Sequence, residues 1–387
     1  MKTMVSNMTH VCLGDVAREI KQKVPAGQEL PTVGLEHLDP GEVELAHWDE
    51  GVETTFTKAF SKGQVLFGRR RAYLRKAAVA PFDGICSGDI TVIAPKDNVS
   101  PRLLPFIIQN DALFEHAVTN SAGSLSPRVK WQSLSQFEFE LPSIAKQEEL
   151  ADILWTAQGT RSHYRQLLTA CDDVVKSQFV EMFGEPAENP KGWETSSLTS
   201  LGSCKNGMNF KSNESGIELP CLGVGDFKDR SVINDVSEMG RINLDDEPAE
   251  GYFLKDGDIV FVRSNGNKEL VGRCLAVYPH GEKAVFSGFC IRLRVESDKV
   301  RIPYLIWALK QPSMRQQMFG RGANVQNLNQ KLMAKVDVPI PPLAEQDRFL
   351  ALVSIVDKSK FAVQKALDEL NATTKKILNQ ELGLGDV

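Results

Sequence analysis

The segment LPSIAKQEEL occupies residues 141–150, and a similar segment, IPPLAEQDRF, occupies residues 340–349. Each has the composition of a strand end followed by a helix start, with proline ahead of the helical run. Gln147 and Gln346 hold the same place in the two segments and lie 199 residues apart, about half of the 387-residue chain. Such a repeat indicates an internal duplication if the flanking sequence repeats as well.

The flanking sequence does repeat, and the matching segments come in the same order in both halves. Some pairs are alternating strands, one is an apolar helix-like run after a proline, and one is a glycine turn leading to a β-branched strand and an arginine. Five matches in register predict a duplicated chain. The pairs are FEFELP (137–142) with KVDVPIP (335–341), SPRLLPFIIQN (100–110) with RIPYLIWALKQ (301–311), CSGDITVIAP (86–95) with FSGFCIRLRV (286–295), FSKGQVLFGRR (60–70) with FLKDGDIVFVR (253–263), and VCLGDV (11–16) with LTSLGS (198–203).

A long helical pattern follows each glutamine. Its stripe of positions steps by four and then three residues over five heptads, which is typical of a coiled coil rather than of a surface helix. Arg161 and Lys360 occupy the same position of this stripe in the two copies. The stripe positions are Leu150, Leu154, Ala157, Arg161, Tyr164, Leu168, Cys171, Val175, Gln178 and Met182, and then Phe349, Val353, Val356, Lys360, Val363, Leu367, Leu370, Thr374, Ile377 and Glu381.

The length of these patterns favours paired helices. A helix of about 38 residues would form a rod about 57 Å long. The alternative is two core helices buried in separate domains, although typical globular helices have only about 10–14 residues. The chain is therefore predicted to be an α+β protein of two mostly-β domains, each followed by a long helix, with the helices pairing as an antiparallel coiled coil with pseudo-twofold symmetry. The predicted boundaries are 1–142 and 185–341 for the domains, and 143–184 and 342–387 for the helices.

Composition restricts the class of protein. With 42% hydrophobic and 25% charged residues, the chain reads as an ordinary globular protein. No stretch approaches the roughly 20 apolar residues that cross a bilayer, and the N-terminus lacks the apolar core of a secretory signal. The seven cysteines are scattered without a CxxC pair, and the six histidines are isolated. These features predict a cytoplasmic protein without a membrane partner, and they argue against disulfides and a metal site.

The net charge of −5 conceals a segregated arrangement. Residues 56–76 contain seven Lys or Arg residues and no acidic residue, and residues 299–336 contain seven more, again with no acidic residue. Acidic residues gather elsewhere, in DPGEVELAHWDEGVE (39–53) and NLDDEPAEG (243–251). Such segregation can give a basic face to a protein whose total charge is negative, so nucleic acid is not excluded as a partner.

The arrangement as a whole resembles the specificity subunit of type I restriction–modification systems. The resemblance covers essentially the whole chain: two variable domains, each followed by a long helix that opens with a P-x-x-x-x-Q turn, here PSIAKQ and PPLAEQ. Two departures leave the subfamily open: LPS replaces the usual double proline, and the second domain has a longer insertion around residues 232–253. Further similar segments are KGQVLFGRRRAYLRKAAVAPFDGICS (62–87), GDIVFVRSNGNKELVGR (257–273) and NPKGW (189–193).

The resemblance implies a protein without catalysis of its own, in which each target-recognition domain reads one half of a bipartite, gapped target in double-stranded DNA. The helical pair would act as a ruler, since half-sites one helical turn apart, about 34–36 Å, lie on the same face of the duplex. It further implies that two modification subunits form an adenine methyltransferase on this chain, and that motor-nuclease restriction subunits join them. No cofactor is expected on the chain itself, because S-adenosylmethionine, ATP and Mg²⁺ belong to the partner subunits.

In the first domain, the basic segment FGRRRAYLRK (67–76) is the best candidate for DNA contact. Arg69, Arg70, Arg71 and Lys76 can contact phosphates, and one arginine could read guanine through a bidentate contact. Strand alternation would send Arg69 and Arg71 to one face and Arg70 to the other. The alternative is a solvated strand end whose arginines pair with the acidic segment DPGEVELAHWDE (39–50).

Three further loops carry candidate contacts. The small, polar segment NSAGSLSPRVKW (120–131) has a counterpart in FGRGANVQNLNQK (319–331), whose amides suit adenine, and VRSNGNKELVGR (262–273) adds more. The alternatives are turn-rich connections, with Asn265-Gly266 as a hairpin turn. The candidates are Ser124, Ser126, Arg128 and Lys130, then Arg321, Asn324, Gln326, Asn327 and Lys331, and then Arg263, Asn265, Asn267, Lys268 and Arg273.

The starts of the two long helices are predicted to bind the modification subunits. Gln147, Glu148, Gln346 and Asp347 are candidate docking surface for the modification subunits. A stand-alone methyltransferase or nuclease lacks support: FGRG (319–322) follows a polar stretch rather than a strand, and there is no N/D-P-P-aromatic tetrapeptide and no phosphate-binding loop. A coiled-coil scaffold would explain the helices but not two duplicated domains. A specificity subunit for a fused methyltransferase–nuclease stays open beside type I.

Overall fold

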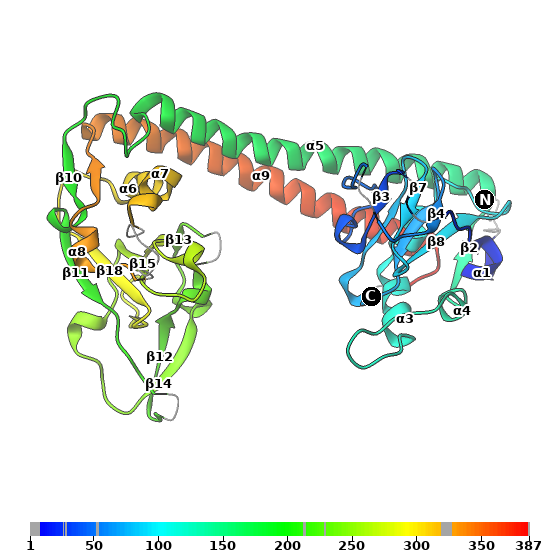
Figure 1. The fold of residues 1–387 in the computed structure, drawn as a ribbon, viewed down its shortest axis with the longest axis horizontal. Helices are drawn as coiled ribbons and strands as arrows, with labels where there is room; N and C mark the ends of the chain where they lie inside the picture. Colours follow the sequence, from blue (N-terminus) through cyan, green and yellow to red (C-terminus); the bar gives the residue numbers. More distant parts are fainter. Residues whose placement is uncertain are drawn as a thin grey trace, which may run out of the picture. The chain divides into compact units, whose positions relative to one another are not determined.

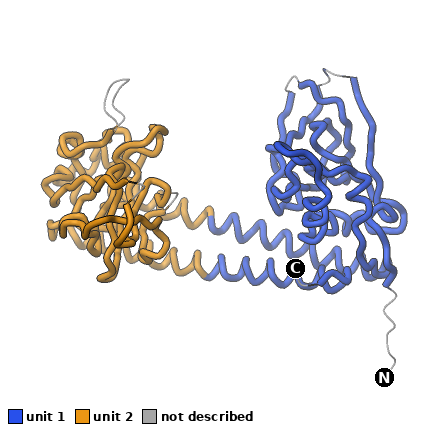
Figure 2. The backbone as a smooth tube through the Cα atoms, turned by 90° about the horizontal axis from the view of Figure 1, so that it is seen from below, with its two compact units in different colours: residues 1–168, 362–387 blue, residues 169–361 orange. Residues whose placement is uncertain are grey.

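The computed structural model describes residues 8–25, 27, 29–51, 54–211, 214–227, 230–318 and 327–385. The α+β prediction is confirmed: short strands form two globular parts, and two long helices accompany them (Figure 1). Helix α5 is Ile144–Phe183 and helix α9 is Leu343–Glu381, each beginning just after the proline of the repeated junction. By its contacts the chain divides into unit 1, residues 1–168 and 362–387, and unit 2, residues 169–361, and both helices contribute to both units (Figure 2).

The repeated glutamine explains why the junction recurs. Gln147 is only 1% exposed, and its side chain joins the first turn of α5 to the loop that precedes the apolar helices of unit 1. Its Oε1 accepts a hydrogen bond from the backbone N–H of Ser100 at 2.7 Å, and its Nε2 donates to the carbonyl of Pro142 at 2.9 Å. An amide side chain is needed here because one end must accept and the other must donate.

Gln346 repeats this arrangement in unit 2. Its Oε1 accepts from the backbone N–H of Arg301 at 2.7 Å, and its Nε2 donates to the carbonyls of Pro341 at 2.7 Å and Lys299 at 3.0 Å. The prediction that Gln147 and Gln346 are docking surface is therefore wrong, since both side chains are buried and hydrogen-bonded to the backbone. They fix where each long helix begins.

Replacing Gln346 with methionine should destabilise unit 2 by about 2–3 kcal/mol, because methionine keeps the volume but leaves a buried N–H and buried carbonyls without partners. The neighbouring change Arg348→Met is the control, since that side chain is 75% exposed, and it should cost less than about 0.5 kcal/mol. Urea denaturation of the full chain measures both. Equal stability of the two variants would show that the glutamine hydrogen bonds do not hold the junction.

The two long helices pack against each other in opposite directions within each unit. In unit 1, Leu150 and Leu154 near the start of α5 share a hydrophobic core with Leu378 and Leu382 near the end of α9. In unit 2, Phe179 and Phe183 near the end of α5 share a core with Phe349 near the start of α9. The early turns of one helix thus meet the late turns of the other, which is the antiparallel order that the duplication predicts.

The predicted stripe is wrong in the last turns of both helices. Gln178 and Met182 were expected to be buried, but Phe179 and Phe183 are the fully buried residues there. At the end of α9, Leu378 and Leu382 are buried in the equivalent way. These turns pack on a globular domain as well as on the other helix, so burial continues in steps of four residues and the strict 4-3 spacing lapses.

Unit 1 contains a four-stranded antiparallel sheet of order β2-β8-β5-β6, a three-stranded sheet of order β3-β7-β4, and the pair β1-β9. Its strands are β1 Thr9–Cys12, β2 Ala17–Ile20, β3 Thr32–Val33, β4 Lys58–Phe60, β5 Val65–Gly68, β6 Ala77–Val79, β7 Gly84–Cys86, β8 Ile90–Pro95 and β9 Glu138–Leu141. Its short helices are α1 Leu13–Val16, α2 Leu104–Ile108, α3 Asp111–Thr119 and α4 Trp131–Leu134.

Unit 2 follows the same plan, with a five-stranded sheet of order β11-β18-β15-β16-β13, a three-stranded sheet of order β14-β12-β17, and the pair β10-β19. The segment 232–253, which the sequence marks as an insertion, supplies the added edge strands β13 and β14. The strands are β10 Thr195–Ser197, β11 Gly202–Asn206, β12 Ile217–Leu222, β13 Val232–Ile233, β14 Gly240–Leu244, β15 Asp258–Val262, β16 Cys274–Val277, β17 Val285–Phe286, β18 Cys290–Val295 and β19 Asp337–Pro339. The helices are α6 Ile302–Lys310, α7 Pro312–Met318 and α8 Gln330–Met333.

Both faces of β5 and β15 are covered, so these two strands are mostly apolar, and the exception is Asp258 at the start of β15, which pairs with Arg294. In β5, Phe67 enters the core that also holds the long helices, whereas Leu66 enters a second core beside the small sheet. In β15, Phe261 and Val260 are divided between two cores in the same way. The apolar run ends at the same point in both units, and polar residues follow.

Candidate nucleic-acid interface

In unit 1, the end of β5 lies beside the loop that leads to α4. The backbone N–H of Val129 donates to the carbonyl of Arg69 at 3.0 Å, and Arg70 forms a β-bridge with Arg128. The N–H of Arg69 donates in turn to the carbonyl of Asp89, in the turn before β8, at 3.0 Å. Two predicted DNA-contact segments, about 60 residues apart in sequence, are therefore neighbours in space.

Unit 2 repeats these backbone hydrogen bonds at the equivalent residues. The N–H of Leu328 donates to the carbonyl of Arg263 at 2.8 Å, and Ser264 forms a β-bridge with Asn327. The N–H of Arg263 donates to the carbonyl of Phe289 at 2.8 Å. The same three loops thus meet at the same strand end in both halves, which is the placement expected of a duplicated binding surface.

In unit 1 a single carboxylate organises two of the predicted arginines. Asp89 accepts hydrogen bonds from Arg128 Nε at 2.7 Å and Nη2 at 3.3 Å, and it lies 3.4 Å from Arg70 Nη1. Arg70 Nη2 also donates to Ser126 Oγ at 3.1 Å. The Arg128 hydrogen bond lowers the pKa of Asp89 below its usual value, so the carboxylate stays ionised at neutral pH. Two guanidinium groups share one negative charge, which leaves a positively charged cluster held in a fixed geometry.

The strand alternation predicted for the arginine segment is wrong. Strand β5 ends at Gly68, and Arg71 adopts a left-handed backbone conformation (φ 53°) ahead of a 3-10 turn, so the alternation expected for Arg69 to Arg71 does not apply. The predicted contact residue Lys76 is half-buried, and its Nζ donates to the carbonyl of Leu35 at 2.8 Å. The predicted alternative, in which the arginines pair with residues 39–50, also differs from the structure, since Arg70 and Arg128 pair with Asp89.

The loop before α4 is closed like a small hairpin. Ala122 and Arg128 exchange backbone hydrogen bonds of 3.1 and 3.0 Å, and Gly123 provides a φ of 119° that a side chain would disfavour. Ser124 and Lys130 are exposed on this loop. Leu125 at its tip is 91% exposed.

The predicted residues of unit 2 have mixed roles. Asn265 Oδ1 accepts from the N–H of Asn267, and Asn267 Oδ1 accepts from the N–H of Glu269, so these amides shape a turn and a 3-10 start rather than the predicted hairpin. Arg273 lines a separate pocket with Arg315. Lys268, Asn327 and Lys331 are exposed, whereas Arg321, Asn324 and Gln326 lie outside the described residues.

Phe289 is a candidate that sequence reasoning missed. It occupies the place in unit 2 that Asp89 occupies in unit 1, and this residue, whose N–H and carbonyl lie beside Arg263, is 61% exposed. The aligned segments CSGDI and FSGFC contain the signal, because they set an aromatic residue against an aspartate. The two halves therefore present different chemistry at one position: an arginine-holding carboxylate in unit 1 and an exposed ring in unit 2.

The other two residues proposed as docking surface are accessible. Glu148 lies 3.7 Å from Arg102, and Asp347 accepts from Arg301 Nε at 2.8 Å, with about half of each acidic side chain exposed. These ion pairs occupy equivalent places at the starts of α5 and α9.

Within the described ranges, no group of three or more His, Cys, Asp or Glu residues could hold a metal ion. Nor does any helix of those ranges have the length and apolar character needed to cross a membrane.

Comparison with known proteins identifies relatives of the whole arrangement. A family model described as the type I restriction modification DNA specificity domain matches residues 6–161 and 190–380. The chain is similar to the StySPI specificity subunit from Salmonella potsdam, with 24% identity over 340 residues, 83% of this chain and 72% of the relative. It is also similar to the EcoKI specificity subunit from Escherichia coli K12, with 25% identity over 295 residues, 69% of this chain and 62% of the relative.

Solved structures show the same fold. One is a chain from work on complex assembly and conformational transition of the type I R-M system, with a TM-score of 0.64, 20% identity and full coverage of both chains. Another is the type I restriction–modification S subunit from M. genitalium, with a TM-score of 0.56, 14% identity, and coverage of 100% of this chain and 98% of that one. At 20% and 14% sequence identity, the structural similarity shows a shared fold and nothing further.

Proposed function

Because the chain belongs to the type I restriction modification DNA specificity family, we propose that it reads a bipartite, gapped sequence in double-stranded DNA, one half with each domain. The supporting observation is the repeated loop arrangement: Arg69 to Val129 in unit 1 and Arg263 to Leu328 in unit 2 join equivalent loops through equivalent hydrogen bonds. Phosphate contacts would fix the register, and the side chains that differ between the halves would read different bases.

The chain acts in this proposal without catalysis of its own. It directs adenine methylation by two modification subunits and supports restriction by motor-nuclease subunits, and those subunits carry S-adenosylmethionine, ATP and Mg²⁺. Glu148 and Asp347, at the starts of the long helices, are the residues proposed for docking of the modification subunits. The cytoplasm is the compartment in which such a system would meet DNA.

Mapping N6-methyladenine across the genome, with and without this gene, tests the proposal. A gapped, two-part motif that disappears on deletion is expected, and it would name the target. An unchanged methylation pattern, in cells where the modification partner is expressed, would contradict the proposal and favour a scaffold. A specificity subunit for a fused methyltransferase–nuclease is the second candidate, and the partner that co-purifies with the tagged chain distinguishes it from type I.

Phe289→Ala should weaken binding of the target duplex about tenfold while leaving the salt dependence unchanged, because an exposed ring contributes apolar base contact and no charge. Fluorescence anisotropy of the complex with its modification subunits, on the duplex found by methylation mapping, measures both quantities over a salt series. Val232→Ala, a partly exposed apolar residue on the edge strand of the same unit, is the control and should bind normally. Normal binding by Phe289→Ala would place the ring outside the interface.

A further inference from the structure

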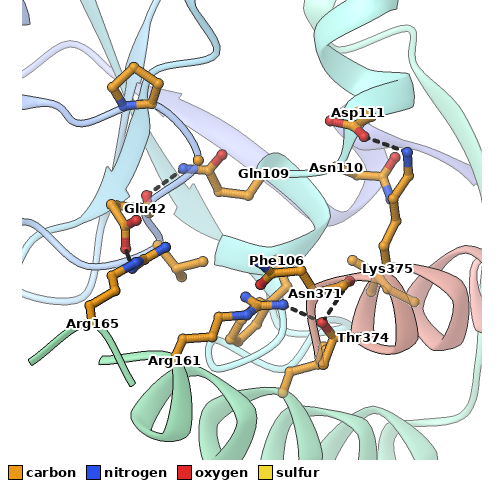
Figure 3. A pocket seen from close by; sticks show the side chains of 15 residues that line it. Glu42, Phe106, Gln109, Asn110, Asp111, Arg161, Arg165, Asn371, Thr374 and Lys375 are labelled. Carbon is orange, nitrogen blue, oxygen red and sulfur yellow. Dashed lines mark hydrogen bonds and ion pairs between the residues drawn. The ribbon is translucent and has the colours of Figure 1, made fainter. Parts of the chain in front are cut away.

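Unit 1 contains a pocket that the proposed function does not use. It has a volume of about 320 Å³ and lies between the loop at residues 40–43, the junction of α2 and α3, and the facing sides of α5 and α9 (Figure 3). Leu154 and Leu378, which pack the two helices together, contribute to its apolar wall. Val43 and Phe106 extend this apolar wall, the other side chains of the lining are mainly polar, and Arg161 is the central charged group.

Arg161 has hydrogen bonds but no ion pair in the described part of the chain. Its Nη1 donates to Gln158 Oε1 at 3.3 Å and its Nη2 donates to Thr374 Oγ1, while its Nε is buried without a partner. Glu42 is the acidic residue that acts on it, but the Glu42 carboxylate bonds Arg165 at 2.7 Å. Burial lowers the pKa of Arg161, and the neighbouring Arg165 lowers it further. Since a guanidinium does not give up its proton in proteins, Arg161 stays charged in this half-buried position, where a nearby anion would stabilise it.

The other positive groups of the pocket already have acidic partners. Lys375 lies 2.7 Å from Asp111 (Figure 3). Asp111 also bonds Arg75 at 2.5 Å. The pocket residues Arg161, Arg165 and Lys375 thus outnumber the acidic residues Glu42 and Asp111. The site has an excess of positive charge, and the excess resides with Arg161.

In unit 2 the residue equivalent to Arg161 has an acidic partner within the chain. Lys360 is the equivalent of Arg161, and it forms an ion pair with Asp172 of α5. The equivalent of Asp172 in α9 is Asn371, which lines the unit 1 pocket close to Thr374 (Figure 3). Unit 2 therefore has a carboxylate, Asp172, beside its cation. Unit 1 has a neutral amide, Asn371, at the equivalent position, where it lines the pocket.

We propose that the unit 1 pocket binds an inorganic oxyanion of the phosphate or sulfate class, which gives Arg161 the negative charge that Asp172 gives Lys360. The hydrogen bonds to Gln158 and Thr374 use one N–H of each Nη of Arg161, so each Nη keeps a second N–H for such an anion, and guanidinium N–H groups match the spacing of phosphate and sulfate oxygens. The Asn371 amide can add a donor from α9. Because the lining comes from both long helices and the globular domain of unit 1, the bound anion stabilises their packing.

The full-length chain without DNA is the material for the test. Its thermal unfolding and isothermal titration with sodium phosphate are compared with sodium chloride at the same ionic strength. A ligand at free concentration L that binds only the folded state stabilises it by RT ln(1 + L/Kd), so the midpoint is expected to rise with the logarithm of the phosphate concentration above Kd and not to rise with chloride. An equal response to both salts, or the absence of saturable binding at millimolar phosphate, would overturn the proposal.

Two variants make the test specific to this pocket. Asn371→Asp installs the internal carboxylate of unit 2, so it should raise the midpoint in chloride and weaken phosphate binding at least tenfold. Asp172→Asn removes that carboxylate from unit 2, so it should lower the midpoint and leave the unit 1 phosphate affinity unchanged. Phosphate binding by Asn371→Asp with wild-type affinity would show that the anion binds elsewhere. Arg161→Gln should abolish binding, and Asn371→Asp gives the answer even if Arg161→Gln fails to fold.

Discussion

Replacing Phe349 with alanine is expected to lower the stability of unit 2 by about 3–5 kcal/mol, the usual cost of removing a buried phenylalanine ring. Phe349 is fully buried at the start of α9. Its ring centroid lies 5.4 Å from that of Phe179, 5.6 Å from that of Phe183 and 5.7 Å from that of Trp307. One truncation therefore opens a cavity among α5, α9 and α6 together.

Hydrogen exchange of the full chain, read by mass spectrometry, distinguishes the two units. Amides of α6 should exchange faster in Phe349→Ala, whereas those of α2 in unit 1 should not change. Leu150→Ala, the equivalent position in α5, should show the reverse pattern, because Leu150 belongs to the core of unit 1. Phe361→Ala is the control for the loss of an exposed ring, since Phe361 is 74% exposed. Uniform destabilisation of both units by Phe349→Ala would show that they do not unfold separately.

Much of the fold follows from the sequence because the chain is duplicated. The paired segments predict the order of elements. Each long helix begins one residue after the predicted start, whereas α9 ends at Glu381 rather than at the predicted residue 387. The burial of Gln147 could not be predicted from spacing alone, because its partner Ser100 lies in a distant loop. The shift of the stripe to Phe179 and Phe183 has the same kind of cause, namely contact with a globular domain that a helix pattern does not contain.

The candidate interface is predicted less completely. The basic and amide-rich loops are visible in the sequence, but their meeting at one strand end depends on tertiary hydrogen bonds such as the one from Val129 to Arg69. The alternation expected for the arginines fails because β5 ends at Gly68. The sequence does not mark Asp89 as a functional residue, because it is a single acidic residue in a turn. Its ion pairs with Arg70 and Arg128 are visible only in the structure.

The double change Arg70→Ala with Arg128→Ala should reduce the affinity for the target duplex by at least about 30-fold, since each lost base or phosphate contact of an arginine costs about 1–3 kcal/mol. The two single variants separate the kinds of contact. Loss of a phosphate contact weakens all sequences alike and reduces the salt slope by about one, whereas loss of a base contact relaxes one position of the target. Anisotropy titrations of target and mismatched duplexes at several salt concentrations measure both effects.

Asp89→Asn tests whether the carboxylate positions the arginines or only neutralises them. Removing its charge should raise the affinity for unrelated DNA, because the cluster becomes more positive. Discrimination in favour of the target should fall at the same time, because Arg70 and Arg128 lose the ion pairs that fix their geometry. Arg75→Ala is the matched control, since this arginine of the same segment pairs with Asp111 and should not affect DNA binding. If Asp89→Asn increases affinity for target and unrelated DNA equally, the carboxylate neutralises the cluster without orienting it.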